Sequence, residues 1–393
     1  MKLGLIAENP LEWLALASGY MPVPLGHTIV ALWLARTLYT ATSVGVFEAL
    51  AGGPLTAAGV AARCQTDPQA TIRLMNALAG TEYVRVLRPK RIAAPSQPPQ
   101  PRAGECSGER NGLACAQPDQ PDQPDQPDQT RYTLTRLARR WLLADSPLSL
   151  RDGVLHQALD LRLMDHYETF VRTGVPLNIH ETLTPEQWEV YQRGMRSGAR
   201  LFAPEVAWRT PVPKGASRLL DIGGANGAFA LALCHRHSTL HATILDLPQA
   251  IEQTRRGLAQ ELKEAGMEER IALQPGDARC ADLGEGAWDV IFISSLLHHF
   301  DDATACDLIE RSARALRSGG YLVIQEIMRS EGDRTGADQL GALADLYFGA
   351  TSAAGTRSFA QFAAWQRTAG LQPLRPRHFR LAPGTGQQSA RKR

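Results

Sequence analysis

A chain of 393 residues with 44% hydrophobic and 21% charged residues has the composition of an ordinary soluble globular protein. Its length provides for about two domains, each large enough to bury a hydrophobic core. The formal net charge of +2 favours neither nucleic acid nor a strongly anionic surface as a partner.

The six cysteines are spread along the chain without a Cys-x-x-Cys pair. This spacing argues against a zinc site or a disulfide framework, and free thiols are typical of the reducing cytoplasm. The residues before Glu8 include no apolar core of the length that a signal peptide needs. We therefore expect a cytoplasmic protein without a metal site.

The stretch 13–35 contains no Asp, Glu, Lys or Arg and is long enough to span a bilayer. Gly19, Pro22, Pro24 and Gly26 interrupt it, which argues against a continuous transmembrane helix. We interpret the stretch as a buried or subunit-interface segment. Weak association with a membrane surface is kept as a hypothesis.

The first 145 residues are predicted to form a winged-helix domain. Two helices follow the candidate N-caps Thr56 and either Thr66 or Asp67, and two short strands follow at 83–87 and 131–134. Helix, helix and hairpin is the order of a winged helix.

The segment 91–130 between the two strands is rich in Pro and Gln and ends in four PDQ repeats, so it is predicted to be a disordered insert. The second helix of the domain, 68–79, offers only Arg73 and Asn76 for contacts with bases or phosphates. A helix that reads DNA normally carries several such residues. The domain is therefore expected to serve dimerisation and not nucleic-acid binding.

Residues 146–216 are predicted to form a mostly helical linker. Leu155, Leu159, Leu163 and Tyr167 share one face of a helix within it. Because the linker leads into a glycine-rich turn, we expect its apolar face to cover the site at that turn.

From residue 217 to residue 383 strands and helices alternate regularly. This order predicts an α/β fold with a doubly wound, Rossmann-like parallel sheet. The last residues, 384–393, are predicted to be a loose tail. The expected strands are 218–222, 241–245, 270–274, 288–293 and 321–325.

Glycines follow the first of these strands in the sequence LLDIGGANG, and an apolar helix begins directly after them. Such a turn lets the backbone approach a ligand, while the free N–H groups of the helix point toward it. The pattern is not the strict dinucleotide fingerprint, because Ala225 and Ala228 replace glycines. It predicts a nucleotide or nucleoside site.

Polar residues stand at the carboxyl ends of all five expected strands, where ligands bind in such sheets. The residue Asp246 is suited to holding two ribose hydroxyls, and Asp277 can accept from an exocyclic amine such as that of adenine. Two cofactors that contain adenosine fit this set, NAD and S-adenosylmethionine. The incomplete glycine pattern favours the second. The strand-end residues are Asp221, Asp246, Asp277, the pair His298 and His299, and Glu326.

Together the stretches LLDIGGANG, ILDLP, GDA, LLHHFDD, LRSGGYLVIQE and AWQRTAGL resemble a known family. They are similar to the S-adenosylmethionine-dependent small-molecule O-methyltransferases of the caffeic acid and acetylserotonin type. The resemblance extends over the winged-helix region and implies a homodimer. It does not cover the PDQ insert or the basic tail.

The resemblance also implies roles for individual residues. The catalytic base of the family falls on His298, and the acidic residue that orients it falls on Glu326. Phe300 stands where a Trp of the family usually flanks the adenine. The residues that the resemblance assigns to the cofactor are Gly223, Gly224, Asp246, Asp277, Ala278 and Phe300.

Three positions depart from the family pattern. His299 follows the base where the family has Asp, so either His298 or His299 could face the acceptor, and the alignment favours His298. A second acidic residue that assists the base in plant enzymes aligns near Thr356 and is missing. Ala225 replaces a glycine of the turn.

The sequence therefore predicts methyl transfer from S-adenosylmethionine to a hydroxyl of a small lipophilic acceptor, which is phenolic, polyketide-like or isoprenoid. A histidine, whose ordinary pKa is about 6.5, can take the hydroxyl proton near neutral pH. Two alternatives stay open. One is a C- or N-methyltransferase or another enzyme that uses the same cofactor, and the other is a DNA-binding regulator that senses a ligand.

Overall fold

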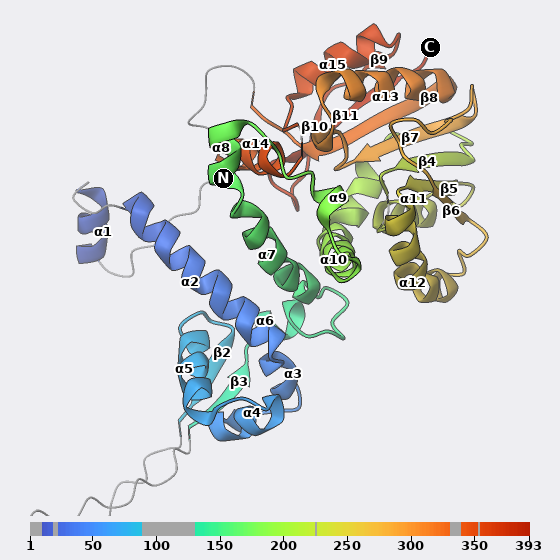
Figure 1. Cartoon of the computed structure of the whole chain (residues 1–393). Coiled ribbons are helices and arrows are strands. Elements are labelled where there is room, and N and C mark those ends of the chain that lie inside the picture. Colours follow the sequence, from blue (N-terminus) through green and yellow to red (C-terminus); the bar gives the residue numbers. More distant parts are fainter. Residues whose placement is uncertain (1–9, 19–22, 89–129, 225, 331–338, 353) are drawn as a thin grey trace, which may run out of the picture. The chain divides into compact units, whose positions relative to one another are not determined.

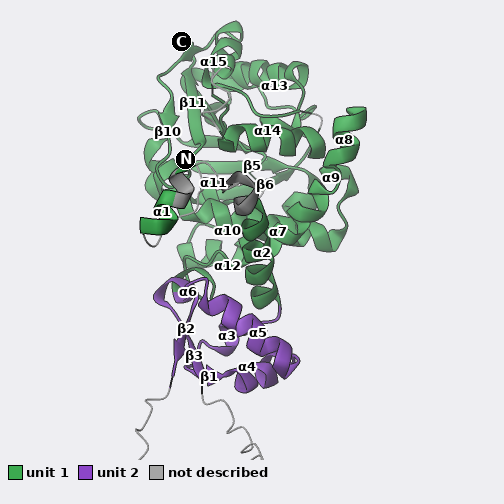
Figure 2. Ribbon diagram, turned by 90° about the vertical axis from the view of Figure 1, so that its left-hand side faces the viewer, with its two compact units in different colours: residues 1–43, 140–393 green, residues 44–139 purple. Residues whose placement is uncertain are grey.

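The computed structural model describes residues 10–18, 23–88, 130–224, 226–330, 339–352 and 354–393. The chain forms two compact units (Figure 2). The smaller unit consists of residues 44–139, and the larger unit combines residues 1–43 with residues 140–393. Each unit has a sheet of its own.

The smaller unit has the predicted order of helix, helix and hairpin. Its sheet has the order β1-β3-β2. The N-cap of α4 is Thr56, which accepts from the N–H of Gly59 at 3.1 Å, and the N-cap of α5 is Asp67, which accepts from the N–H of Ala70 at 2.7 Å. Nearly all of the predicted insert 91–130 lies outside the described residues. The elements are α3 (Val46–Ala49), β1 (Leu55–Thr56), α4 (Ala57–Cys64), α5 (Pro68–Ala79), β2 (Val84–Leu87), β3 (Arg131–Leu134) and α6 (Arg136–Trp141).

The uncharged stretch 13–35 is divided between α1 (Pro10–Ala17) and α2 (Val23–Ser43). No helix in the described part of the chain is long and apolar enough to cross a membrane. The side chains of Trp13 and Trp33 are 65% and 66% exposed. They are therefore not part of the hydrophobic core of the single chain.

The predicted helical linker consists of α7 (Arg151–Met164), α8 (Tyr167–Thr173), α9 (Ile179–Thr182) and α10 (Pro185–Arg209). A complete capping box of Thr184 and Gln187 starts α10. Gly194 allows α7 to approach α10 closely, because a Cβ at Gly194 would lie 2.4 Å from the Cβ of His156.

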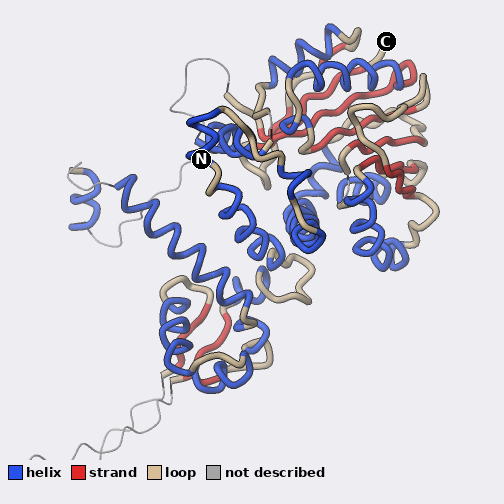
Figure 3. The backbone as a smooth tube through the Cα atoms, viewed as in Figure 1, coloured by secondary structure: helices blue, strands red, loops and turns tan. Residues whose placement is uncertain are grey.

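The larger unit is built around an eight-stranded sheet with the order β10-β11-β8-β7-β4-β5-β6, in which β9 also pairs with β11 (Figures 1 and 3). The five adjacent strands β8, β7, β4, β5 and β6 are mutually parallel, and β11 runs antiparallel to β8. The predicted doubly wound fold is confirmed. The strands are β4 (Arg218–Ile222), β5 (His241–Asp246), β6 (Ile271–Pro275), β7 (Trp288–Ser294), β8 (Leu316–Ile327), β9 (Gln372–Pro373), β10 (Arg377–His378) and β11 (Thr385–Arg391).

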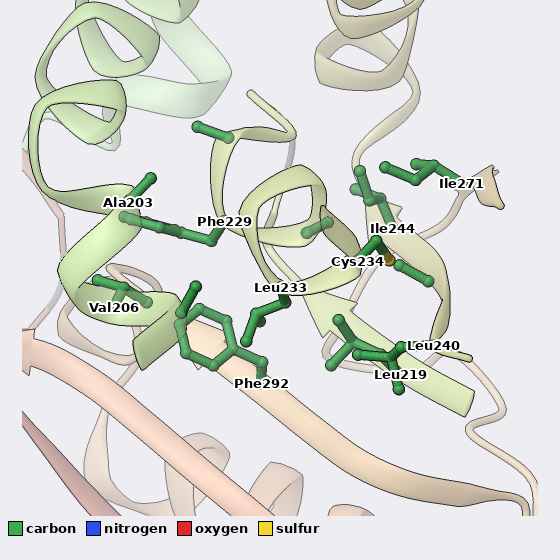
Figure 4. Packing of buried hydrophobic residues seen from close by; sticks show 14 of the residues in the cluster. Ala203, Val206, Leu219, Phe229, Leu233, Cys234, Leu240, Ile244, Ile271 and Phe292 are labelled. Atoms are coloured by element: carbon green, nitrogen blue, oxygen red, sulfur yellow. The ribbon is translucent and has the colours of Figure 1, made fainter. Parts of the chain in front are cut away.

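Different helices cover the two faces of the sheet. Residues of α10, α11 (Ala228–Arg236) and α12 (Pro248–Ala265) form a core with one face, and residues of α13 (Asp302–Ala315) and α15 (Phe359–Thr368) form a core with the other. Within β7, Phe292 belongs to the first core and Ile291 and Ile293 belong to the second, as the alternation of a strand requires. Figure 4 shows Phe292 beside Phe229 of α11, with 5.8 Å between the ring centroids.

The expectation of a loose tail at 384–393 is wrong, because residues 385–391 form β11, and each residue of β11 pairs with β8. The side chains of Gln387, Gln388 and Ser389 are buried. The side-chain amide of Gln387 donates to Thr210 Oγ1 at 2.8 Å and to Gln325 Oε1 at 3.1 Å. A polar sequence can form a buried strand here because the side-chain NH₂ groups of Gln387 and Gln388 find acceptors.

Candidate functional site

The glycine turn connects β4 to α11 at the carboxyl end of the sheet. Gly223 has φ of 74° and donates its N–H to the carbonyl of Leu245 at 2.8 Å, and Gly227 has φ of 70°. Both conformations lie in the left-handed region that favours glycine. Ala225, which departs from the glycine pattern, lies outside the described residues.

Asp221 at the end of β4 has a carboxylate that is buried directly under this turn. A Cβ at Gly224 would lie 2.3 Å from Cγ of Asp221, so only glycine fits above the carboxylate. Neither carboxylate oxygen has a hydrogen-bond partner within the described part of the chain. Burial, together with the nearby charge of Asp246, raises the pKa of Asp221 to about 8.

Asp246 and Asp277 follow the two neighbouring strands. Asp246 ends β5, is half-buried, and accepts from the N–H of Leu247 at 2.7 Å. Asp277 lies two residues after β6, and its carboxylate accepts from Nε and Nη2 of Arg279 at 2.9 Å and 2.7 Å. The hydrogen bonds from Arg279 lower the pKa of Asp277. In the sheet the strands β7, β4, β5 and β6 are consecutive, so their carboxyl ends form one continuous edge.

The loops that follow β6 and β7 are each held by a buried or half-buried arginine. Arg311 donates to the carbonyl oxygens of Ala278 at 2.7 Å and Arg279 at 3.0 Å. Arg357 donates to the carbonyl oxygens of Leu297 and Phe300, each at 2.6 Å. Guanidinium groups are suited to this because they carry five donors in a fixed plane. The half-buried Phe300 is thereby fixed at the edge of the sheet.

His298 and Glu326 form a buried pair at the ends of the neighbouring strands β7 and β8. The distance between Nδ1 of His298 and Oε2 of Glu326 is 2.6 Å. The other oxygen, Oε1, accepts from the N–H groups of Leu296 and Leu297 at 2.9 Å and 2.8 Å. Both carboxylate oxygens of Glu326 therefore have a partner, and the ring of His298 is held at Nδ1.

Further residues contact this pair from helices outside the sheet. The ring of Phe348, in α14 (Gln339–Thr351), stacks on His298 with 3.6 Å between centroids and 20° between planes. Nε2 of His299 lies 3.0 Å from Nε2 of His298, and Nδ1 of His299 lies 2.6 Å from Oγ of Ser352. The ring of His180, in α9, meets His299 edge to face at 4.4 Å.

Burial, with a smaller contribution from the neighbouring His298, lowers the pKa of His180 to about 4. Burial and the two neighbouring imidazoles lower the pKa of His299 well below its ordinary value. Both side chains are therefore neutral at pH 7. His180 also stacks on Trp188 of α10, which packs against Leu247 and Ala250 beside Asp246.

The structure thus brings the sequence-predicted residues to one edge of the sheet in two groups. Gly223, Gly224, Asp246, Asp277 and Ala278 lie around β4, β5 and β6, and His298, Phe300 and Glu326 lie around β7 and β8. Thr356 occupies the position of the missing acid and hydrogen-bonds to Asp345 Oδ1 at 3.0 Å. The described residues include no group of three or more His, Cys, Asp or Glu side chains that could hold a metal ion.

Sequence reasoning missed the roles of three groups. Asp221 was recognised as a strand end, but its burial directly under the glycine turn was not foreseen, although an acid that closes a buried strand before glycines was an available signal. Ser352 and Arg357 gave no local signal, because each reaches the site from more than 50 residues away in the sequence.

Comparison with known proteins agrees with this geometry. The O-methyltransferase domain family matches residues 149–372, and the O-methyltransferase dimerisation domain family matches residues 27–94. Acetylserotonin O-methyltransferase of Mus musculus is 26% identical over 322 residues, which cover 78% of this chain and 72% of that protein. Aclacinomycin 10-hydroxylase RdmB of Streptomyces purpurascens is 27% identical over 326 residues, which cover 79% of this chain and 73% of that protein.

The fold is shared with solved structures. Human N-acetylserotonin methyltransferase in complex with S-adenosylmethionine superimposes with a TM-score of 0.74 at 19% identity, covering 98% of this chain and 99% of the human one. The cofactor of the family is S-adenosylmethionine. This chain therefore belongs to the O-methyltransferase family and is an S-adenosylmethionine-dependent O-methyltransferase with an N-terminal dimerisation domain.

Proposed function

We propose that the enzyme transfers the methyl group of S-adenosylmethionine to a hydroxyl of a small lipophilic acceptor, with His298 as general base and Glu326 behind it. The observation that carries this proposal is the buried His298–Glu326 pair, with 2.6 Å between Nδ1 and Oε2. The phenolic, polyketide-like and isoprenoid classes are the acceptors to be tested.

The protein's part in the chemistry is to remove a proton. A neutral hydroxyl is a poor nucleophile, and a positioned base increases the rate by about 10²- to 10⁴-fold. With Nδ1 of His298 donating to Glu326, only Nε2 can take up a proton, and the anionic carboxylate then stabilises the imidazolium. The bound cofactor supplies a methyl carbon on a positively charged sulfur, which leaves with the electrons of the C–S bond.

The residues around the glycine turn fit this cofactor. Gly223 and Gly224 leave the backbone open to close approach, and the carboxyl group of Asp221 lies directly below them. A cationic ligand bound beside this carboxyl group would favour its charged form. The cofactor has two cationic groups, the amine and the sulfonium. Further along the edge, Asp246 is placed for the ribose hydroxyls and Asp277, with Ala278 and Phe300, for the adenine.

The surroundings of the base support a lipophilic and aromatic acceptor. Phe348, Trp188 and Tyr191 lie around the histidines, and Trp188 meets both His180 and Tyr191 within 6 Å between ring centroids. Rings of this kind bind apolar ligands through large contact areas. Trp188 and Tyr191 come from α10 of the linker, and Phe348 comes from α14, outside the linker.

We further propose that the enzyme is a homodimer. The match to the dimerisation domain covers α2, where Leu32, Trp33 and Leu34 are between 46% and 66% exposed in the single chain. Exposed apolar residues in such a run are typical of an interface with another chain.

The test begins with calorimetric titration of the protein with S-adenosylmethionine, and with NAD as the control. Micromolar binding of the first alone is expected. The enzyme is then incubated with deuterated-methyl cofactor and a panel of naphthols, hydroxylated polyketides and isoprenoid alcohols, and products are identified by mass spectrometry. Absence of cofactor binding would overturn the proposed arrangement of Asp246 and Asp277.

The second candidate function is hydroxylation of a small acceptor. One observation favours it: a relative that matches 79% of this chain is named a hydroxylase. The panel separates the two functions. A product that gains the deuterated methyl group on oxygen supports the first function, and one that gains oxygen without the label supports the second.

A further inference from the structure

The two adjacent histidines form part of one directional chain of hydrogen bonds. Nδ1 of His298 lies 2.6 Å from Glu326, Nε2 of His298 lies 3.0 Å from Nε2 of His299, and Nδ1 of His299 lies 2.6 Å from Oγ of Ser352. Each imidazole thus uses both ring nitrogens. His298 contacts Glu326 through Nδ1 and His299 through Nε2, and His299 contacts Ser352 through Nδ1.

The carboxylate end sets the direction of the chain once the tautomer of His298 is given. Oε1 of Glu326 accepts from two backbone N–H groups, and Oε2 faces Nδ1 of His298. In a neutral His298 with its proton on Nδ1, which the experiment below tests, Nε2 has a lone pair and no proton. The proton in the contact between the two Nε2 atoms therefore belongs to His299. Nδ1 of His299 is then the acceptor of the hydroxyl proton of Ser352.

Burial leaves one approach to this chain. The side chain of His298 is 5% exposed, with Phe348 stacked on its ring and Glu326 at Nδ1, and His299 occupies its Nε2. His299 itself is only half-buried. One imidazole lone pair accepts one good hydrogen bond, so an acceptor molecule cannot bond to Nε2 of His298 while His299 holds that position.

We propose that His299 is a second catalytic residue, which takes the proton of the acceptor hydroxyl and passes its own proton to His298. This inference rests on the proposed function and adds a residue to its base. The acceptor hydroxyl takes the place of Ser352 Oγ at Nδ1 of His299, and its proton moves to that nitrogen. The proton on Nε2 of His299 moves to Nε2 of His298.

The step is balanced. The acceptor oxygen keeps the electron pair of its O–H bond and uses it for the bond to the methyl carbon. His299 ends neutral in its other tautomer, and His298 ends as an imidazolium beside Glu326. The proton is thus stored on the histidine that has a carboxylate partner.

The other titratable groups support this division of roles. His180 faces His299 from α9, and Glu326 faces His298 from β8. The low pKa of His299, caused by burial and by its two imidazole neighbours, makes His299 poor at keeping a second proton and suited to passing one on.

The deciding experiment is ¹⁵N NMR of the histidine side chains, which needs neither cofactor nor acceptor. In the wild-type protein we expect Nδ1–H on His298, Nε2–H on His299, and a ¹⁵N–¹⁵N coupling across their hydrogen bond. In Glu326→Gln the carbonyl oxygen stays with the two backbone donors, so the side-chain NH₂ must donate to Nδ1 of His298. His298 is then expected to carry its proton on Nε2 and His299 on Nδ1, the reverse of the wild type.

Ser352→Ala is the matched control, because it shortens the chain at the other end and leaves Glu326 in place. Its two tautomers are expected to stay as in the wild type. Inversion of His298 alone in Glu326→Gln, or no coupling in the wild type, would overturn the relay. If circular dichroism shows that Glu326→Gln does not fold, the relay is tested by the wild-type protein alone, through its two tautomers and the coupling between the histidines.

A kinetic arm uses an acceptor found with the panel. His299→Phe is expected to lose about 100-fold or more in methyl transfer, with the affinity for S-adenosylmethionine unchanged. A rate within twofold of the wild type would overturn the relay while leaving the methyltransferase function in place. Absence of cofactor binding or of methyl transfer in the wild type would instead refute the proposed function, and the NMR result would stand independently.

Discussion

The α-carbon of Gly224 lies so close to the carboxylate of Asp221 that a Cβ there would be 2.4 Å and 2.6 Å from its two oxygens. A methyl group has no alternative rotamer that could relieve such a contact, so the turn must move. We expect Gly224→Ala to lose about 100-fold or more in affinity for S-adenosylmethionine, measured by calorimetry. Gly198→Ala in α10 is the control, because a Cβ at Gly198 meets nothing within 4 Å. Equal affinities of the two variants would contradict the placement of the cofactor.

A second prediction concerns pH and the raised pKa of Asp221, about 8 against an ordinary 3.8. Between these values the folded state holds a proton that the unfolded state has released, so the free energy of unfolding falls as pH rises toward 8. Asp221→Asn removes this dependence. The variant should gain stability relative to the wild type from pH 5 to pH 8 in urea unfolding. A pH-independent difference would show that Asp221 is ionised in the folded protein.

The third prediction tests the base. His298→Ala should lower the rate of methyl transfer by about 10²- to 10⁴-fold, because the hydroxyl proton then has no acceptor with a carboxylate behind it. The dissociation constant of S-adenosylmethionine should not change. The exposed His241 provides the control variant His241→Ala. Retention of most activity by His298→Ala would point to an enzyme that uses the cofactor without this base.

The fourth prediction compares Arg357, which holds the loop after β7, with Arg311, which holds the loop after β6. Their lysine variants should affect kcat and cofactor affinity differently. A lysine at position 357 has one ammonium group and cannot bond at once to Asp302 and to the carbonyls of Leu297 and Phe300. Arg357→Lys should therefore lower kcat by about 10- to 100-fold with little change in cofactor affinity. Arg311→Lys loosens the loop at Ala278 and should mainly weaken cofactor binding. The same pattern in both variants would indicate general destabilisation.

The fifth prediction concerns β11. Deleting residues 385–391 removes seven paired positions from the strand next to β8, which carries Glu326. We expect the shortened protein to show no cooperative unfolding transition, because the deletion removes the backbone pairing and the buried side chains of a whole strand, whereas the typical stability of a domain is only about 5–15 kcal/mol. Arg391→Ala, at an exposed position, should unfold like the wild type. A deletion variant with a normal transition would show that the strand is dispensable.

The sheet could be predicted because its parallel strands are buried on both faces and read as hydrophobic runs. The limits of β4 agree with the prediction to the residue, and Thr56 and Asp67 were identifiable as caps from their type and position. β11 could not be predicted, because the side-chain NH₂ group of Gln387 donates to Thr210 and Gln325, which are distant in the sequence. Local polarity does not reveal such partners.

The candidate site was predictable where strand order alone brings residues together, as for His298 and Glu326. It was not predictable where the contact depends on a helix that crosses the sheet edge. Ser352 and Phe348 of the α14 region reach the two histidines in this way, and Arg357 reaches the loop below them. The contacts from His298 to His299 and from His299 to Ser352 likewise could only be read from the folded chain.

The side chains around the histidines come from α9, α10 and α14, whereas the proposed base and the strand-end acids belong to the sheet and its turns. Under the proposed function, evolution can therefore exchange the helical residues for a new acceptor without rebuilding the residues proposed to handle the proton and the cofactor. His180, Trp188 and Tyr191 are positions where such divergence can accumulate. A scaffold divided in this way is a ready starting point for directed evolution, with libraries confined to the helices.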